Sequence, residues 1–146
     1  MRGVRVVFPE RGRAELEAFE LPALAPGQVL IENEYTVISA GTERANLLNM
    51  PNTEGAYPQH PGYCGVGRVI ARASDIADPM EGARVLVYHG GHQSHCVMKA
   101  EGLVTVPEAV DPLEASFMII ASMSLQGLRK TRPELGESGL VIGQGL

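Results

Sequence analysis

Apolar and polar residues alternate along much of the chain before Val106, which is the period of β-strands that bury one face. In the clearest case, 29–37, one face carries apolar side chains and the other polar ones: Val29, Ile31, Tyr35 and Val37 against Glu32, Glu34 and Thr36. Turn signals such as Pro26-Gly27 separate the segments. Further short strands are predicted at 4–8, 14–19, 66–73, 84–88, 94–98 and 103–106. The first part of the chain is therefore predicted to be a β-rich domain.

Two segments have helical signals. A short helix is predicted from Thr42 to Asn49, with the Thr42 hydroxyl as its cap and Pro51 after its end. Asp111-Pro112-Leu113-Glu114 combines a capping residue, a proline at the first helical position and an acidic third residue, and predicts a helix to about Lys130. Because apolar residues nearly surround this second helix, we expect it to be buried between two layers.

The C-terminal segment has the pattern of a buried strand followed by glycines. The strand is predicted at 138–142, and Gly143-Gln144-Gly145 follows it directly. A dinucleotide pyrophosphate needs glycines where it approaches the backbone at a helix N-terminus. Taken alone, the pattern is also explained by a glycine turn after any strand.

Composition excludes several classes of function. The 146 residues suffice for one ordinary domain. The chain has 12 Lys+Arg and 17 Asp+Glu, which gives a net charge of −5, and 5% of its residues are aromatic. A nucleic-acid-binding domain usually has a basic face and stacking aromatics, so none is predicted. The longest apolar stretch, 117–125, is too short to cross a membrane, and no targeting segment is visible. A cytoplasmic protein is expected.

Four segments resemble the medium-chain dehydrogenase/reductase family, which includes the zinc-type alcohol dehydrogenases. They are Ile38–Arg44, Tyr57–Ile70, Glu81–Val85 and Leu103–Pro107, and they occur in the family's order along the chain. The match is to the N-terminal, GroES-like substrate domain. The resemblance implies a mainly β fold, a GroES-like partly open β-barrel at 1–110, in a parent protein of the α/β class. It also implies a linking helix at 111–137 and, at 138–146, the first strand of a truncated Rossmann dinucleotide-binding domain.

The resemblance further implies an enzyme, an NAD(P)-dependent oxidoreductase. Such an enzyme transfers hydride between the nicotinamide of NAD or NADP and an alcohol/carbonyl or enone substrate. Gly143 and Gly145 would then bind the cofactor. We expect a small-molecule substrate, no nucleic-acid or membrane partner, and a homodimer formed through the missing Rossmann domain. The substrate and the choice between NAD and NADP stay open.

The chain departs from the family where zinc-dependent members have their metal ligands. Ala40 stands at the position of the ligand cysteine, Tyr63 at that of the histidine and Cys64 at that of the neighbouring glutamate. The stretch 117–123 has no Cys, His or Asp, and there is no room for the loop of the structural zinc. A hydrocarbon and a phenol cannot replace thiolate and imidazole. We therefore predict a zinc-independent protein with no metal ligands.

Thr42, Tyr63 and His92 are the candidate catalytic residues. Within the family, Gly41–Arg44 and Pro61–Tyr63 resemble a zinc-lacking subgroup that includes bacteriochlorophyllide dehydrogenases. Thr42 occupies the family's proton-relay position, although it could instead only cap the helix. Tyr63 could donate to the substrate oxygen or simply fill the space left by the metal. His92 is expected to line the substrate cleft.

Two other classes of function remain open. The segment from His89 to Cys96 contains three histidines and a cysteine, and with His60 and Cys64 it could form a metal-binding module. The chain could also be a non-catalytic GroES-like barrel. Both cysteines are most simply buried apolar residues, because two cannot make a disulfide framework.

The chain is expected to be a truncated form of its family's architecture. Alone, we expect it to bind no dinucleotide tightly and to catalyse no reaction. We also expect an exposed apolar surface on the linking helix to promote association.

Overall fold

The first two strands form an antiparallel hairpin, β1 (Arg2–Glu10) and β2 (Arg13–Glu20). The computed structural model describes residues 1–53, 55–143 and 145. Val4 pairs with Ala18 and Val6 with Leu16, so the hairpin presents one apolar face. Gly12 supplies the left-handed backbone of the turn, with φ 79°. Both strands are confirmed where the alternating pattern predicted them.

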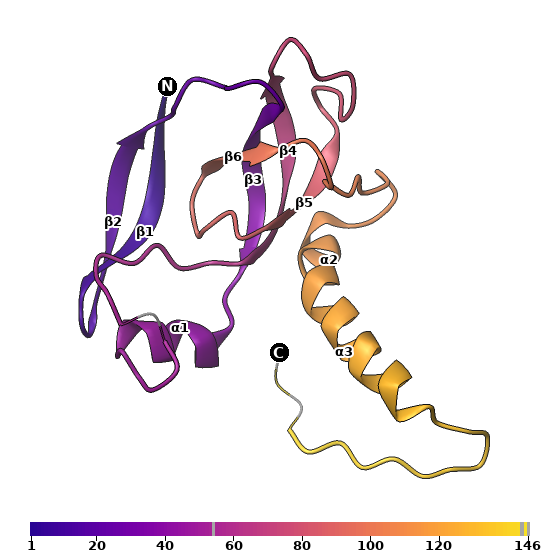
Figure 1. The fold of residues 1–146 in the computed structure, drawn as a ribbon. Coiled ribbons are helices and arrows are strands. Elements are labelled where there is room, and N and C mark those ends of the chain that lie inside the picture. The colour runs from indigo at the N-terminus through magenta and orange to yellow at the C-terminus, as the bar shows by residue number, and fades with distance from the viewer. Residues whose placement is uncertain (54, 144, 146) are drawn as a thin grey trace.

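A second, four-stranded sheet contains the remaining strands in the order β5-β4-β3-β6. Its members are β3 (Gln28–Val37), β4 (Cys64–Arg72), β5 (Arg84–Tyr88) and β6 (His95–Lys99), and every neighbouring pair is antiparallel. The free edge of β1 is hydrogen-bonded to loops of this sheet: Val6 N–H donates to the His92 carbonyl at 2.8 Å and Phe8 N–H to the Gln59 carbonyl at 2.9 Å. The hairpin and the sheet therefore lie against each other, as Figure 1 shows. The predicted partly open, mainly β barrel is confirmed.

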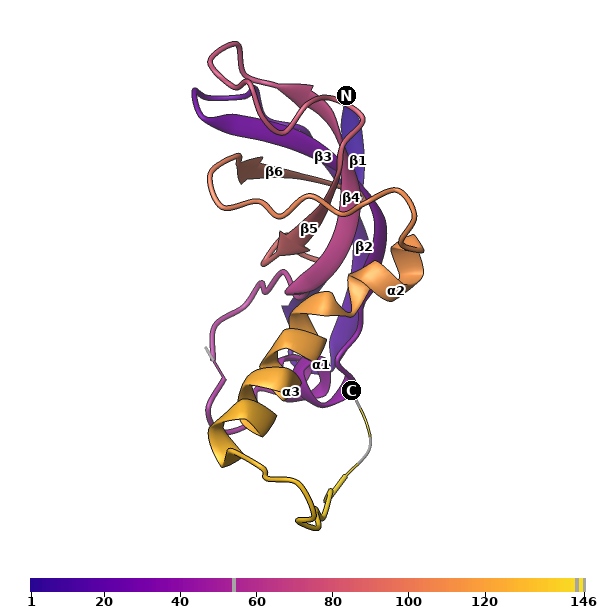
Figure 2. The ribbon, with the colours of Figure 1, turned by 90° about the vertical axis from the view of Figure 1, so that its right-hand side faces the viewer.

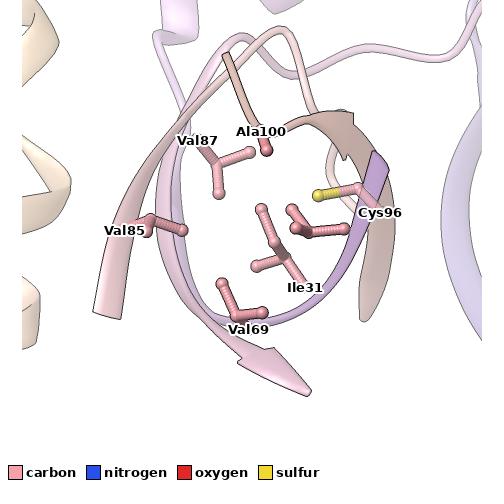
Figure 3. Close-up of a cluster of buried hydrophobic side chains, with 7 residues drawn as sticks. Ile31, Val69, Val85, Val87, Cys96 and Ala100 are labelled. Carbon is pink, nitrogen blue, oxygen red and sulfur yellow. The ribbon is translucent and has the colours of Figure 1, made fainter. Parts of the chain in front are cut away.

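The core lies inside the curl of the four-stranded sheet. Figure 3 shows side chains from several strands pointing toward one another within it. The buried cluster consists of small and β-branched residues, which suit a tightly curled sheet: Val29, Ile31, Val69, Val85, Val87, Cys96 and Ala100. Burial raises the pKa of the Cys96 thiol to about 12, so this cysteine stays protonated and packs as an apolar residue.

The alternation of β3 breaks in its second half. The pairing with β4 shifts register between Asn33 and Tyr35, as in a β-bulge. Tyr35 was predicted to share the buried face with Val29, but it is 45% exposed, whereas Glu34 and Thr36 are half-buried. The extra residue at the bulge changes the alternation locally and accounts for the exposure of Tyr35, whereas Val37, at the end of the strand, is buried as predicted.

The strand predicted at 103–106 is reduced to an isolated bridge. Thr105 pairs with Val85, and the Val106 N–H donates to the Arg84 carbonyl at 2.8 Å. The segment is thus placed beside β5 without a continuing ladder.

The first helix, α1 (Ala40–Leu47), begins earlier than predicted. Ser39, with extended backbone angles of φ −86° and ψ 92°, is its N-cap residue. Thr42 therefore lies inside the first turn, and the prediction that it caps the helix is wrong. Its hydroxyl lies 3.1 Å from the Ser39 hydroxyl.

The linking helix is divided into α2 (Pro112–Ser116) and α3 (Met118–Thr131). The Asp111 cap is confirmed, since its Oδ1 accepts from the N–H groups of Leu113 at 2.8 Å and Glu114 at 3.3 Å. The helix is divided where a side-chain hydroxyl takes the backbone carbonyl that would accept the next helical hydrogen bond. The Ser116 hydroxyl donates to the Leu113 carbonyl at 2.6 Å, and Phe117 N–H donates to the carbonyl only three residues back.

The helix α3 is not buried between two layers as predicted. It contains no buried residue, and Leu125 and Leu128 are each 57% exposed. Figures 1 and 2 show it extending away from the strands. The described residues supply no second layer to cover it. Among them, no helix is both long and apolar enough to span a bilayer.

The segment 138–142 is not a strand in the structure. Leu140, Val141 and Ile142 are 87%, 70% and 90% exposed. A strand requires a neighbour to accept its backbone hydrogen bonds, and no described strand lies beside this segment. The domain boundaries at 110 and 137 remain predictions.

Candidate functional site

A cavity of about 470 Å³ lies between α1, the loop before β4 and the end of β5. Its lining includes a hydroxyl, a carboxylate, a phenol and two imidazoles, from Thr42, Glu43, Tyr63, His60 and His89. We refer to it as the polar cavity. It is the place in the fold where the predicted residues Thr42 and Tyr63 come together.

Thr42 reaches the polar cavity because the helix begins at Ala40. The residue is exposed, in the first turn of α1. Among the described residues, its hydroxyl has one hydrogen-bonding neighbour, the Ser39 hydroxyl at 3.1 Å, and it does not cap the helix. It can therefore accept or donate a proton to a bound molecule.

Tyr63 lies just before β4 and is half-buried. The chain passes very close to the loop before β6 here. A Cβ at Gly62 would collide with the backbone nitrogen of His92, and Gly62 has φ 114°. Only glycine is compatible with both conditions. This close approach fixes the position of Tyr63 at the cavity wall.

His89 also lines the polar cavity, although the sequence analysis did not predict it as a cleft residue. It follows β5 directly, is exposed, and has a left-handed backbone with φ 58°. Its N–H donates to the Tyr63 carbonyl at 2.9 Å. Its ring centroid lies 4.0 Å from that of Tyr88 and 6.4 Å from that of Tyr63. The sequence did offer one sign of this role, because His89 directly follows the strand predicted at 84–88. The sequence analysis instead treated His89 as part of a possible metal-binding segment.

His92 lies behind the polar cavity rather than in its lining. The residue is 8% exposed, and its ring connects two other elements. Nδ1 lies 2.9 Å from the Thr36 hydroxyl and Nε2 lies 3.2 Å from Glu43 Oε1. His92 borders a neighbouring apolar cavity of about 420 Å³. The structure thus brings Thr42 and Tyr63 together but does not bring His92 to them.

Glu43 separates the two cavities and lines both. Its residue exposure is 9%, and its second oxygen, Oε2, is buried without a hydrogen-bond partner among the described residues. Burial, with the nearby Glu43 charge as a second cause, raises the pKa of the Cys64 thiol to about 11. Cys64 therefore remains a thiol near neutral pH.

The segment from His89 to Cys96 does not form a metal centre. Across residues 1–53, 55–143 and 145, no three His, Cys, Asp or Glu side chains are placed to share an ion. The reason is that each member of the segment has a different environment. His89 stacks on Tyr88, His95 Nδ1 lies 2.9 Å from the Ser94 hydroxyl, and Cys96 is in the core. The metal-binding alternative has no support in this geometry.

The predicted cofactor glycines lie in the irregular C-terminal segment. Gly143 has φ 85°, which suits a tight glycine turn, and a Cβ added at either Gly143 or Gly145 would meet no described atom within 4 Å. The cofactor-binding role of Gly143 and Gly145 stays a prediction. Gln144 and Leu146, the other residues of this pattern, lie outside the described residues.

Comparison with known proteins finds one curated dehydrogenase that aligns with nearly the whole chain. The chain is 25% identical to 2-desacetyl-2-hydroxyethyl bacteriochlorophyllide A dehydrogenase of Cereibacter sphaeroides, over 99% of this chain and 50% of that protein. The chain thus spans about half the length of this curated relative. No family model matches the chain.

Solved structures share the fold. A short chain alcohol dehydrogenase from Escherichia coli, complexed with NADH, has a TM-score of 0.77 at 16% identity, over 90% of this chain and 46% of that one. A mutant form of enoyl thioester reductase from Candida tropicalis has a TM-score of 0.74 at 14% identity, over 92% and 45%. The resemblance to the medium-chain dehydrogenase/reductase family is therefore confirmed, in the fold and along nearly the whole chain.

Proposed function

We propose that this chain is the substrate domain of an NAD(P)-dependent oxidoreductase that works without zinc. The reaction would be hydride transfer between the nicotinamide and an alcohol/carbonyl or enone substrate. The observation that carries the proposal is the convergence of Thr42 and Tyr63 on one polar cavity. The fold shared with oxidoreductases supports the reaction class.

The donor set at the family's zinc position does not fit zinc. Ala40 offers no donor atom, and Tyr63 offers a phenol in place of an imidazole. Cys64, where the family has the neighbouring glutamate, is buried at the start of β4. The residues present thus support polarisation of the substrate oxygen by hydrogen-bond donors.

Thr42 and Tyr63 would supply those donors. A hydroxyl and a phenol that line one cavity can both donate hydrogen bonds to a substrate oxygen, and such donors stabilise the charge that develops on it. Thr42 is suited to move the proton, because its hydroxyl is exposed and not used as a cap. Tyr63 is suited to hold the oxygen in place, because Gly62 and β4 fix its backbone.

The cofactor supplies the site that gains or loses two electrons as hydride. Gly143 and Gly145 are the residues of this chain that would approach its pyrophosphate. The rest of the chemistry attributed to this chain is binding, orientation and proton movement.

The test is hydride transfer in the protein that carries this chain, followed by nicotinamide absorbance with a panel of alcohols, aldehydes, ketones and enones. We expect Thr42→Ala to lower kcat by about 100-fold, and Tyr63→Phe by about 10- to 100-fold. Thr131→Ala and Tyr35→Phe change the same residue types outside the polar cavity and should leave kcat unchanged. Unchanged kcat in both site variants would remove these residues from the mechanism.

A further inference from the structure

We infer that His89 is the acid–base residue of the polar cavity, which exchanges the substrate-oxygen proton with solvent. This inference rests on the proposed function and deepens it. Thr42 and Tyr63 can pass a proton along hydrogen bonds, and a third group that reaches solvent would complete the path. Imidazole is the side chain that ordinarily gains and loses a proton in that range.

The proton balance of the reaction gives such a group a defined task. When an alcohol is oxidised, its C–H bond breaks and the hydrogen leaves with both electrons to a nicotinamide dinucleotide, which is reduced. The O–H bond also breaks, and its electron pair forms the new C=O bond. The remaining proton passes to a ring nitrogen of His89 and then to water. Carbonyl reduction uses the same steps in reverse.

The location of His89 meets both requirements of this role. Its side chain lines the polar cavity with Thr42 and Tyr63, and the residue is also exposed to solvent. Its backbone N–H donates to the Tyr63 carbonyl at 2.9 Å, and its ring contacts that of Tyr88 in a tilted arrangement, with the centroids 4.0 Å apart. These contacts hold the backbone of His89 beside Tyr63 and its ring beside Tyr88.

The backbone of His89 supports a functional constraint. A left-handed φ of 58° is uncommon for a residue with a side chain, and such strain concentrates at active and binding sites. A glycine would adopt this backbone without strain, as the two glycines that follow, Gly90 and Gly91, could. The histidine side chain at this position is therefore consistent with a functional role.

The other titratable groups around His89 are less suited to proton exchange. Glu43 is buried and its Oε1 is engaged with His92 at 3.2 Å. His60 also lines the polar cavity, but its Nε2 lies 4.0 Å from Oε2 of Glu17 in the hairpin.

The first test measures contact without catalysis. The ring nitrogens of His89 are followed by NMR in this chain while cyclohexanol and, separately, cyclohexanone are added. We expect the His89 ring signals to move with those of Tyr63, while those of His95, whose ring lies beside Ser94, stay in place. His89 signals that do not move while those of Tyr63 do would overturn the inference. Signals of both residues that stay in place would contradict the polar cavity as the substrate site as well.

The second test uses His89→Asn in the protein that carries this chain, because asparagine tolerates a left-handed backbone and cannot exchange a proton. We expect kcat to fall by at least about 100-fold, with a loss of one limb of the pH profile and partial rescue by added imidazole. His95→Gln is the matched control. A wild-type pH profile in His89→Asn would overturn the inference while leaving the proposed function in place. Absence of hydride transfer in the wild-type protein would refute the proposed function, and the inference with it.

Discussion

His92 Nε2 lies 3.2 Å from Glu43 Oε1, and the His92 Nδ1 lies 2.9 Å from the Thr36 hydroxyl. Through one buried ring, the loop before β6 is thus bonded to α1 and to the end of β3. Thr42 is the residue before Glu43, so this pair holds the turn that presents the Thr42 hydroxyl to the polar cavity.

Replacement of His92 by leucine should destabilise the fold. Glu43 would keep its buried carboxylate and lose its nitrogen donor, which costs about 1–3 kcal/mol of unfolding free energy. Urea denaturation measures this loss, with His95→Leu as the control on β6. Adding Glu43→Leu should recover part of the loss, because no charged group is then left buried. A cost for His92→Leu no larger than that of the control would contradict the structural role of the pair.

Gly62→Ala should be more damaging than Gly82→Ala. Both glycines have left-handed backbones, with φ 114° and 87°, but only Gly62 faces an obstacle, the backbone of His92. We expect the additional overpacking at Gly62 to cost about 1–3 kcal/mol more, measured by urea denaturation. Equal losses in the two variants would show that the close approach of the two loops is not a constraint.

Stability should fall in acid because of an ion-pair network beside the core. Arg84 donates to Glu34 at 2.7 and 3.2 Å, and Arg68 donates to Glu108 at 2.9 and 2.8 Å. The hydrogen bond from Arg84 lowers the pKa of Glu34, and the hydrogen bond from Arg68 lowers that of Glu108.

The sign of the pH dependence follows from these lowered values. Each carboxylate stabilises the fold fully above its ordinary pKa of 4.5, and the contribution is lost as the pH falls through the lower pKa of the folded state. We expect Glu34→Gln to lower Tm by several degrees at pH 7 and to flatten the dependence of Tm on pH below about 4.5. Glu20→Gln, which removes an exposed pair with Arg2, should change little. An unchanged acid slope in Glu34→Gln would contradict the network.

The Asp111 cap of the linking helix should contribute measurably to the unfolding free energy. Asp111 Oδ1 accepts from two backbone N–H groups of α2, so Asp111→Ala should lower the unfolding free energy by about 1 kcal/mol. Asp111→Asn retains an acceptor oxygen and should lose only a few tenths. Thermal denaturation of the two variants compares them, and equal losses would contradict the cap.

The strands and the Asp111 cap could be predicted because their signals are local. Alternation placed β1, β2 and β5 closely, and an aspartate followed by proline marked the start of α2. The bulge after Asn33 could not be predicted, because it depends on the pairing of β3 with a distant strand. The exposed face of Tyr35 follows from that pairing.

The candidate site was only partly accessible from the sequence. Thr42 and Tyr63 were predicted from motif positions, and the structure places both on one cavity. His89 lines the polar cavity and His92 does not, and the left-handed backbone at His89 was not indicated by any local pattern. Similarly, the apolar residues of α3 could not reveal whether a neighbouring layer covers them in this chain.

The most direct test of metal-free hydride transfer is the activity and metal content of the untagged protein that carries this chain, measured together before and after dialysis against a zinc chelator. We predict turnover that is unchanged by the dialysis, and less than about one zinc per ten chains before it, because Ala40, Tyr63 and Cys64 make a poor donor set. Turnover that disappears with the chelator and returns with added zinc would contradict the account.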